Sequence, residues 1–526
     1  MLNRILLLIA GAIAAVTSFA FAENSSEPSQ EKTGYFQFGL DFNLGFNGGP
    51  TDPTFAVEEL ENYKNCENCD DWLALRIPLE NARSYEESIE PFFMLAFRAG
   101  YKNFHFLLEA PLRKDLEAWY RSDLKTNFTY KPSELDINVP INAYGKWYNP
   151  VGFVQFGRFE LDDLKISKND VLLGGLPYHD GIHWKFNVGI FRYDFLLSSL
   201  NAWLFGDVMD HETGCPQDKD SEAYVQKCTP RSKQVSNQRK RTYTENVKNM
   251  VFHRLGVETN KFWFYLVEQS VIGGKSLEFR SFNPFMYWHD NYATGYTSAA
   301  TSFELGYKTS NGAKFYTQLN FEDFASPVGE KKEKGTTRTI VNYMVGYYHE
   351  LETRKYGKFS WRLDVVRTDP VAYNSRLPLL KYTGRRNYRS NFREQGEDNY
   401  ADAFFVDYPI GYRRGGDALD LWFDMNWKWN RHAAKLTLAW LRQGDKELYT
   451  DYDVALKSEN SLSGVVEKQF LVDVLYEREV NDWFKFYAGG GFRVYRNLAH
   501  DKNEDGADAW IRSGVKFSFN PVDKKF

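Results

Sequence analysis

The sequence predicts an all-β protein: a transmembrane, antiparallel, up-and-down β-barrel of about eighteen strands, with short periplasmic turns and long extracellular loops. Three observations predict it: an export signal at the N-terminus, strand-length segments in which apolar and polar residues alternate, and connections that are alternately short and long. After the export signal no run of about eighteen apolar residues occurs, so a spanning helix is not expected. The chain of 526 residues is long enough for several domains, but a large barrel is a single domain.

Residues 1–22 have the features of a secretory signal peptide. Arg4 supplies a positive charge, a long apolar run follows, and residues 20–22 read AFA, which is an A-x-A cleavage site. The residue directly after that site is Glu23 and not cysteine, so a lipid-anchored N-terminus is not expected. We therefore expect an exported protein of the cell outer membrane, in which residues 23–526 form one barrel domain.

The first predicted strand covers residues 34–49 and reads GYFQFGLDFNLGFNGG. Phe or Leu occupies every even position from Phe36 to Phe46, and polar residues or Gly occupy the positions between them. Because successive side chains of a strand point to opposite faces, the apolar residues share one face. Such a long strand matches a tilted crossing of a bilayer. We expect the aromatic face to contact lipid and the polar face to line the lumen, so that an arginine is tolerated far better at Asn43 than at Phe42.

The same alternation recurs along the chain in pairs of segments joined by short turns such as NPVG, SNG, NRHA and VND. The further predicted strands are FFMLAFRAGY, NFHFLLEA, DINVPINAYGKW, FVQFGRFEL, GIHWKFNVGI, RYDFLLSSLNAW, VFHRLGVE, FWFYLVEQ, SFELGYKT, AKFYTQLNFEDF, TIVNYMVGYY, FSWRLDVV, ALDLWFDMNWKW, AKLTLAW, KQFLVDVLYE, WFKFYAGGGFRVY and AWIRSGVKFSF. Tryptophans lie near the strand ends, where the aromatic girdles of a membrane barrel belong. They are Trp147, Trp361, Trp427, Trp429, Trp483 and Trp510.

Long polar segments separate these pairs, and we expect them to be extracellular loops. They cover residues 47–90, 111–135, 161–180, 205–247, 272–298, 367–415, 442–464 and 497–508. A soluble sandwich or propeller gives no reason for long and short connections to alternate so regularly. The alternation therefore favours an outer-membrane barrel.

The final strand is expected to end near Phe519. The apolar alternation reaches Phe517 and Phe519 and then meets Asn520-Pro521. Proline cannot donate to a sheet ladder and is usually confined to strand edges. Residues 520–526 are therefore expected to form a short periplasmic extension, whose terminal Phe526 is a candidate handle for the barrel-assembly machinery.

Two regions resemble the capsule-assembly Wzi family of outer-membrane barrels. One is FHRLGVETNKFWFYLVEQSVIGG followed by LEFRSFNPFMYWHDN, in which a strand hairpin precedes an N-P-hydrophobic-aromatic-His stretch; the other is FGRFEL followed by LLGGLPYHDGIHWKF. The likeness covers residues 152–324. It implies a barrel of the same strand number and a lectin-like role in surface attachment or assembly of capsular or extracellular polysaccharide. Family members that hold capsule close the periplasmic end with a helical bundle, whereas here the helical candidates VEELENYKN and RKDLEAWYRSD fall in predicted extracellular loops.

A long loop rich in arginine and tyrosine is the main candidate for polysaccharide binding. Arginine forks bind carboxylates or phosphates in pairs, and tyrosine rings stack on sugars. The candidates in this loop are Tyr382, Arg385, Arg386, Tyr388, Arg389, Arg393, Arg413 and Arg414, and the WHDN stretch adds Trp288, His289 and Asp290. The alternative is that the arginines pair with Glu394, Glu397 and Asp398 of the same loop or with lipopolysaccharide phosphates, and that WHDN is an internally satisfied cluster.

The four cysteines predict loop disulfides. An even number of cysteines in an exported chain is typical of disulfides, and proximity in sequence suggests two local pairs. The residues are Cys66, Cys69, Cys215 and Cys228, and the suggested pairs are the first two and the last two. A zinc site is the less favoured alternative, because the second pair lacks the C-x-x-C spacing of zinc knuckles.

A calcium candidate lies in HDKNEDGADAW. Asp501, Asn503 and Asp505 alternate and a glycine follows, as in the first half of a calcium loop. Arg512 stands where a bidentate acid belongs, which leaves Asp508 as the candidate substitute. The alternative is a solvated acidic hairpin loop.

Two functions follow from these observations. The first is the surface-polysaccharide role that the family resemblance implies; the alternative is a porin-like channel for small solutes or polysaccharide export, since a barrel of this size is wide enough for a water-filled lumen unless loops fold inward. The predicted lumen-facing residues mix both signs of charge, so no simple ion selectivity is expected. They include Lys185, Arg362, Asp364, Asp420, Asp424, Lys428, Lys485 and Arg493.

No catalytic constellation stands out in the sequence, because a Ser-His-Asp arrangement, a nucleophile elbow and a phosphate loop are all missing. We therefore expect no enzymatic activity and no cofactor besides the calcium candidate. The formal net charge of -5 argues against nucleic acid as a partner. The expected partners are outer-membrane lipid, lipopolysaccharide and the barrel-assembly machinery, with capsular or extracellular polysaccharide under the first function.

Overall fold

The computed structural model describes residues 34–48, 79–88, 90–121, 126–131, 134–136, 141–161, 163–200, 247–274, 277, 297–322, 339–375, 378–389, 403–450, 452–458 and 462–525. The predicted signal peptide and all four cysteines lie outside these residues, as does the helical candidate VEELENYKN. No helix within the described residues is long and apolar enough to cross a membrane.

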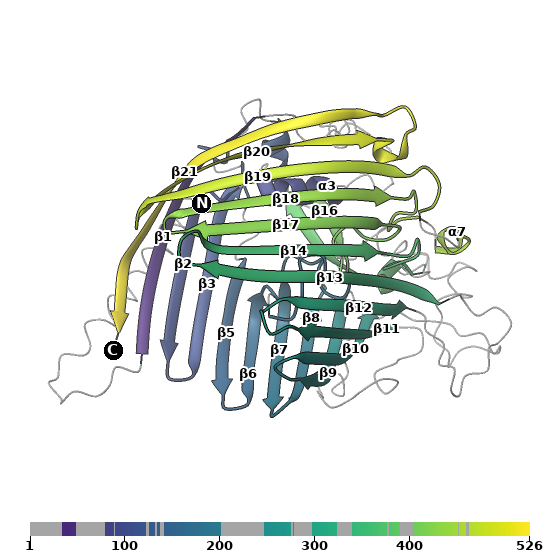
Figure 1. Cartoon of the computed structure of the whole chain (residues 1–526), viewed down its shortest axis with the longest axis horizontal. Helices are drawn as coiled ribbons and strands as arrows, with labels where there is room; N and C mark the ends of the chain where they lie inside the picture. The colour runs from purple at the N-terminus through teal and green to yellow at the C-terminus, as the bar shows by residue number, and fades with distance from the viewer. Residues whose placement is uncertain are drawn as a thin grey trace, which may run out of the picture.

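Antiparallel strands form one sheet that closes into a barrel (Figure 1). The sheet has 19 strands in the described residues, but the two-residue β4 (Leu135–Asp136) pairs only with the end of β3, so 18 strands form the wall. The wall strands are β1 (Gly34–Gly48), β2 (Phe93–Tyr101), β3 (Phe104–Lys114), β5 (Asn142–Asn149), β6 (Gly152–Phe159), β7 (His179–Val188), β8 (Phe191–Ser199), β9 (Lys248–Glu258), β10 (Phe262–Gly273), β11 (Thr297–Lys308), β12 (Lys314–Glu322), β13 (Ile340–Thr353), β14 (Gly357–Arg367), β17 (Leu419–Trp429), β18 (His432–Gln443), β19 (Glu467–Asn481), β20 (Phe484–Arg496) and β21 (Gly506–Lys525). β1 pairs with both β2 and β21, which closes the barrel and confirms the predicted fold class.

The two faces of the wall alternate as predicted. On β1, Phe42 and Leu44 are 44% and 53% exposed, whereas Asn43 between them is 3% exposed. Large apolar side chains are likewise exposed on other strands, for example Phe315 and Ile511. An outer surface of exposed apolar side chains, repeated strand after strand, matches the lipid-facing band of an outer-membrane barrel.

Asn43 does not behave as an open lumen position. Its backbone carbonyl oxygen accepts a hydrogen bond of 2.9 Å from Asn127 Nδ2, and Tyr487 donates to its side-chain Oδ1. The expectation that an arginine costs far less at Asn43 than at Phe42 stays a prediction, and the packing of Asn43 under an inward-folded connection makes this position a poor place to test it.

Most of the predicted tryptophan girdle lies on the outer face. Trp147, Trp429 and Trp483 are exposed and adjoin short turns. Trp510 differs, because its Nε1 donates to Asp473 Oδ1 at 3.2 Å inside the lumen. The alternation explains this correction: Ile511, the next residue, is the outward-facing member of the pair.

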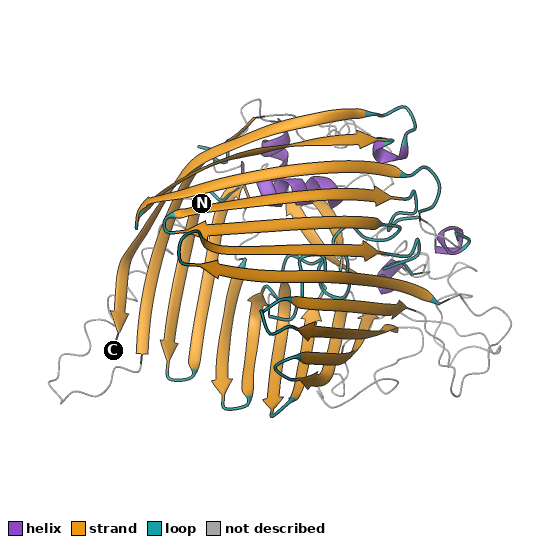
Figure 2. Ribbon diagram, viewed as in Figure 1, coloured by secondary structure: helices purple, strands orange, loops and turns teal. Residues whose placement is uncertain are grey.

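Several long connections fold into the barrel rather than away from it (Figure 2). They contribute α3 (Leu79–Ser88), α4 (Leu116–Arg121), the inner hairpin β15 (Thr383–Arg389) and β16 (Ala403–Pro409), η6 (Pro378–Leu380), and the internal segment, which we define as residues 163–178. Two short helices, α7 (Tyr452–Leu456) and η7 (Leu498–His500), lie in later connections. Residues of the candidate RKDLEAWYRSD do form a helix, α4, whereas α3 was not predicted.

The main hydrophobic core lies in the lumen. Val171 and Leu172 of the internal segment pack in one cluster with Tyr408 of the inner hairpin and with Phe252 and Met344 of the wall. Gly175 permits a close approach: a Cβ built there would lie 1.7 Å from the carbonyl oxygen of Pro409. The lumen is therefore filled in part by apolar packing.

The last strand is longer than predicted. β21 continues through Pro521 to Lys525, which pairs with Tyr35 of β1. The pairing with β20 ends at Phe517, so the residues after it need a partner on one side only, and the register shifts opposite Asn520 and Pro521. Proline is tolerated at such an edge or bulge. The prediction that the strand ends near Phe519 is therefore wrong; Phe526 lies outside the described residues.

Candidate functional site: a pocket in the barrel lumen

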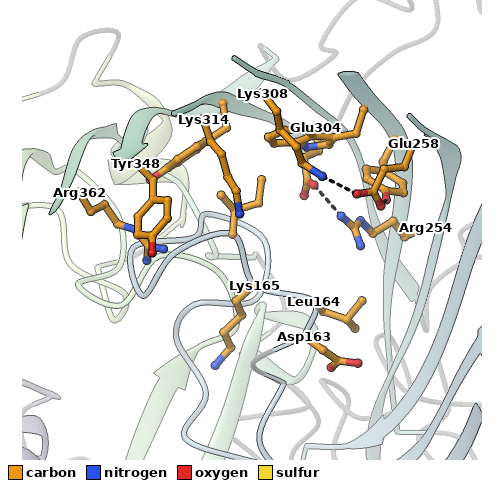
Figure 3. Close-up of a pocket in the computed structure, with 14 residues that line it drawn as sticks. Asp163, Leu164, Lys165, Arg254, Glu258, Glu304, Lys308, Lys314, Tyr348 and Arg362 are labelled. Atoms are coloured by element: carbon orange, nitrogen blue, oxygen red, sulfur yellow. Dashed lines mark hydrogen bonds and ion pairs between the residues drawn. The ribbon is translucent and has the colours of Figure 1, made fainter. Parts of the chain in front are cut away.

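A cavity of about 420 Å³ lies in the lumen between the internal segment and the wall from β9 to β14 (Figure 3). We call it the lumen pocket. Its lining residues are Asp163, Leu164, Lys165, Ile166, Arg254, Glu258, Trp263, Tyr265, Glu304, Lys308, Lys314, Tyr316, Tyr348 and Arg362. Glu258, Lys308 and Lys314 adjoin the short turns of the wall, so the pocket lies in the half of the lumen that faces the predicted periplasmic side.

Strand alternation and register bring these side chains together. On each wall strand, residues two or four apart face inward, as Arg254 and Glu258 do on β9. Tyr348 of β13 is the direct cross-strand partner of Lys314 on β12 and of Arg362 on β14. These three side chains therefore form a row across three neighbouring strands.

The buried side of the pocket carries a hydrogen-bonded ion network. Arg254 donates to Glu304 Oε1 at 2.6 Å and to Asp194 Oδ2 at 3.2 Å, and His183 Nε2 lies 3.2 Å from the same aspartate. The guanidinium also lies 3.6 Å from the ring centre of Tyr265. Removing one of these side chains would leave a buried charge without its partner. We therefore assign this network a structural role in the barrel wall.

A second pair lies nearer the short turns. Lys308 Nζ lies 2.8 Å from Glu258 Oε1 (Figure 3). Tyr265 donates to the other oxygen of that glutamate at 3.0 Å. Lys308 also lies over the ring of Trp263, 5.4 Å from its centre. This lysine is thus already neutralised by the protein.

Lys314 and Arg362 are different. Lys314 Nζ lies 5.4 Å and Arg362 Cζ 5.3 Å from the centre of the Tyr348 ring, which the two cations flank (Figure 3). Neither lies within ion-pair distance of a carboxylate of the described residues, and the buried Nε of Arg362 has no hydrogen-bond partner there. A negative charge beside this row is Glu350, which accepts a hydrogen bond of 2.9 Å from Tyr348 and pairs with Lys358 at 2.8 Å. The lining of the pocket from β12 to β14 therefore carries two cations and no carboxylate.

The internal segment is anchored to the wall beside the pocket. Asp364 of β14 accepts hydrogen bonds from Ser167, from Asn169 Nδ2 at 3.0 Å and from Tyr316 at 2.5 Å. One strand further along, Lys168 Nζ lies 2.7 Å from Asp424 Oδ1. These contacts fix the floor of the pocket.

The arginines predicted to bind polysaccharide lie inside the barrel where the structure describes them. Arg385 donates twice to Asp407, at 2.8 Å each, and Arg386 pairs with Glu86 and with Asp136. These partners are carboxylates of this chain, but not the acids of the same loop that the sequence suggested. Both guanidinium groups are thus committed to internal ion pairs.

The second arginine pair is also packed inside. Arg414 lies 2.9 Å from Asp420 Oδ1, and Arg413 lies over the ring of Trp422 at 5.6 Å. Tyr382 is buried in the main core. For Tyr388 and Arg389 only the backbone, at the end of β15, is described, and Arg393, Trp288, His289 and Asp290 lie outside the described residues. Polysaccharide binding by this set stays a prediction.

The calcium candidate forms a turn with internal hydrogen bonds. Asp501 Oδ1 accepts from the backbone N of Asn503 at 2.9 Å, and Asp505 Oδ1 accepts from the backbone N of Asn497 at 3.0 Å. Asp508 lies on β21 and pairs with Arg493 at 2.7 Å. Among the described residues no three His, Cys, Asp or Glu side chains are arranged to hold a metal. Calcium binding stays a prediction, with Asp508 engaged elsewhere.

Sequence reasoning placed Arg362 on the lumen face but missed Lys314 and Tyr348 as its neighbours. Alternation assigns each residue to a face of its strand, but it does not give the register between strands. The register is what places Lys314, Tyr348 and Arg362 side by side. The apolar LLGGL at residues 172–176 was the available signal that a predicted loop folds inward.

Comparisons with known proteins assign the chain to no family. No protein-family model and no curated protein matches the sequence. Solved structures that match include OprD of Pseudomonas aeruginosa, with 8% identity, coverage of 93% of this chain and 96% of that chain, and a TM-score of 0.39. OccD3 (OpdP) of the same organism has 8% identity, coverage of 94% of this chain and 96% of that chain, and a TM-score of 0.40. A loop-deletion mutant of Vibrio cholerae OmpT has 8% identity, coverage of 93% of this chain and 100% of that chain, and a TM-score of 0.32. The barrel fold stated above rests on the strand pairing of this chain itself. The resemblance to the Wzi family stays a hypothesis.

Proposed function

We propose that this protein is a porin-like channel of the outer membrane, whose lumen takes up small solutes along a path narrowed by inward-folded segments. One observation carries the proposal: the lumen pocket, whose charged, tyrosine and tryptophan side chains come from six consecutive wall strands. Charged side chains inside a membrane barrel belong to a water-filled space, because they are costly to bury in an apolar one.

The amount of packing in the lumen supports a selective path and not a wide pore. A barrel of about 18 strands encloses an aqueous channel when its interior is left open. Here the internal segment and the inner hairpin occupy part of that interior with apolar side chains. Solutes would therefore meet a constriction beside a charged pocket, the combination that sets selectivity in channels.

The polysaccharide role is the runner-up. It rests on the family resemblance, and the described arginines that motivated it are engaged with Asp407, Glu86, Asp136 and Asp420. The channel proposal needs no rearrangement of these ion pairs.

Single-channel recording in a planar lipid bilayer tests the proposal. Folded protein, verified by its heat-dependent shift on gels, should give discrete and reproducible conductance steps, while a heat-unfolded sample of the same preparation should give none. Binding of the cell's own surface polysaccharide is measured in parallel. Polysaccharide binding without conductance would contradict the channel and favour the runner-up.

A further inference from the structure

The charges that line the lumen pocket do not balance. The lining holds the carboxylates Asp163, Glu258 and Glu304, and each of them lies near a cation: Lys185 at 3.9 Å, Lys308 at 2.8 Å and Arg254 at 2.6 Å, respectively. The remaining wall cations of the pocket, Lys314 and Arg362, are in ion-pair distance of no carboxylate among the described residues; Glu350, which Tyr348 binds at 2.9 Å, lies outside the lining and is paired with Lys358. The excess positive charge is thus concentrated at one place.

The geometry of that place suits one anionic group. Lys314 and Arg362 project from β12 and β14, which flank β13, so their backbones lie about 9 to 10 Å apart. Both side chains are long enough to meet over the Tyr348 ring that separates them, and Figure 3 shows them on either side of it. An arginine fork and a lysine ammonium are the usual partners of carboxylate and phosphate oxygens.

A bound anion between Lys314 and Arg362 is more favourable than an empty site. Two like charges close together in a partly buried pocket repel each other, and the buried Nε of Arg362 lacks a hydrogen bond within the described residues. A bound anion would relieve both costs at once. A cavity of about 420 Å³ leaves room for a ligand body the size of a hexose.

We infer that the lumen pocket is a binding subsite for small organic anions, in which Lys314 and Arg362 hold the carboxylate or phosphate group of a hexose-sized solute. This inference rests on the proposed function and names the class of solute that the channel would take. It also differs from the expectation drawn from the strands as a whole, whose lumen charges mix both signs.

Isothermal titration calorimetry on the full-length protein in detergent micelles tests the inference. The probes are glucuronate, which carries a carboxylate, and glucose 6-phosphate, which carries a phosphate; glucose is the neutral match. We expect salt-sensitive binding of at least one anion and no comparable binding of glucose. Comparing the two anions shows which oxyanion the subsite prefers.

Three variants locate the binding. Lys314→Gln and Arg362→Gln should each weaken the anion about tenfold or more, because each removes one charge-assisted contact. Lys428→Gln is the matched control, since Lys428 also faces the lumen, on β17, but does not line the pocket. The affinity of the Lys428→Gln variant for the anion should equal that of the unmodified protein. Heat-dependent gel shifts verify that every variant is folded.

Calorimetry and conductance recording together distinguish a failure of the subsite proposal from a failure of the channel proposal. Equal affinity for glucose and both anions, no binding to the folded unmodified protein, or unchanged affinity in both pocket variants would each overturn the subsite. Conductance steps that persist under these outcomes would leave the channel standing. Anion binding by a protein that never conducts would instead support the subsite and remove the channel.

Discussion

At the scale of single residues, Asp364 links the wall to the interior of the barrel. The sequence predicted its place on the lumen face but could not show its partners, because Ser167 and Asn169 lie far from it in the chain and meet it only once the barrel has closed. Its side chain is buried, and its two oxygens receive three hydrogen bonds. One carboxylate thus holds the internal segment against β14.

Asp364→Asn should loosen the internal segment. The amide keeps one acceptor oxygen but turns a donor toward groups that also donate, which costs about 1 to 3 kcal/mol. We expect a larger or noisier single-channel conductance and faster proteolysis within residues 163–178. Asp482→Asn, in an exposed turn, is the control and should leave both unchanged. Identical traces for the two variants would show that Asp364 does not anchor the segment.

The inner hairpin should respond to acid through Asp407. Burial by itself raises the pKa of this carboxyl, but Arg385, with a hydrogen bond from Tyr449, outweighs burial and holds the pKa below its ordinary value. A depressed pKa means that the ionised carboxyl adds stability above the unfolded-state pKa of about 3.9, and that this stability is lost as the pH falls through the lower folded-state pKa. Hydrogen exchange of residues 383–389 should therefore accelerate only in strong acid. In Asp407→Asn that acid step should be missing.

At the scale of elements, the strands were predictable and the connections were not. Alternation is a local property of a wall strand with lipid on one side and polar groups on the other, so Phe42 and Phe519 were placed on the correct face. The inward folding of residues 163–178 depends on tertiary packing against Tyr408 and Met344, which no local pattern encodes. For the same reason Arg385 and Arg386 looked like surface groups in the sequence.

Neighbouring residues on β17 test the assignment of faces. Met425 points to the lipid side and Asn426 to the lumen, where its side chain is exposed. Met425→Arg should cost about 2 to 4 kcal/mol if it lies near the bilayer midplane, whereas Asn426→Arg should cost far less. Urea unfolding in lipid vesicles measures both. Equal losses of stability would count against the assigned faces.

At the scale of the whole molecule, the protein combines a membrane wall with an interior packed like a soluble domain. The wall needs only pairing and alternation, whereas the interior needs segments distant in sequence to fit together, such as Gly175 against Pro409. The lumen pocket exists because that interior stops short of the wall from β9 to β14. Hence the sequence alone predicted a barrel with a polar lumen but not a pocket with a net charge.

The tail formed by residues 520–526 adds to the closure of the barrel. Of the 13 registered pairs between β1 and β21, the four from Tyr35 to Phe38 involve residues 522–525. Each cross-strand pair contributes roughly 0.2 to 1 kcal/mol, so deleting residues 520–526 should leave a barrel that unfolds at a clearly lower temperature on heat-shift gels. Replacing the tail with seven serines keeps the backbone pairing and should restore part of the loss. A deletion variant as stable as the full chain would contradict this contribution and would support a strand that ends at Phe519.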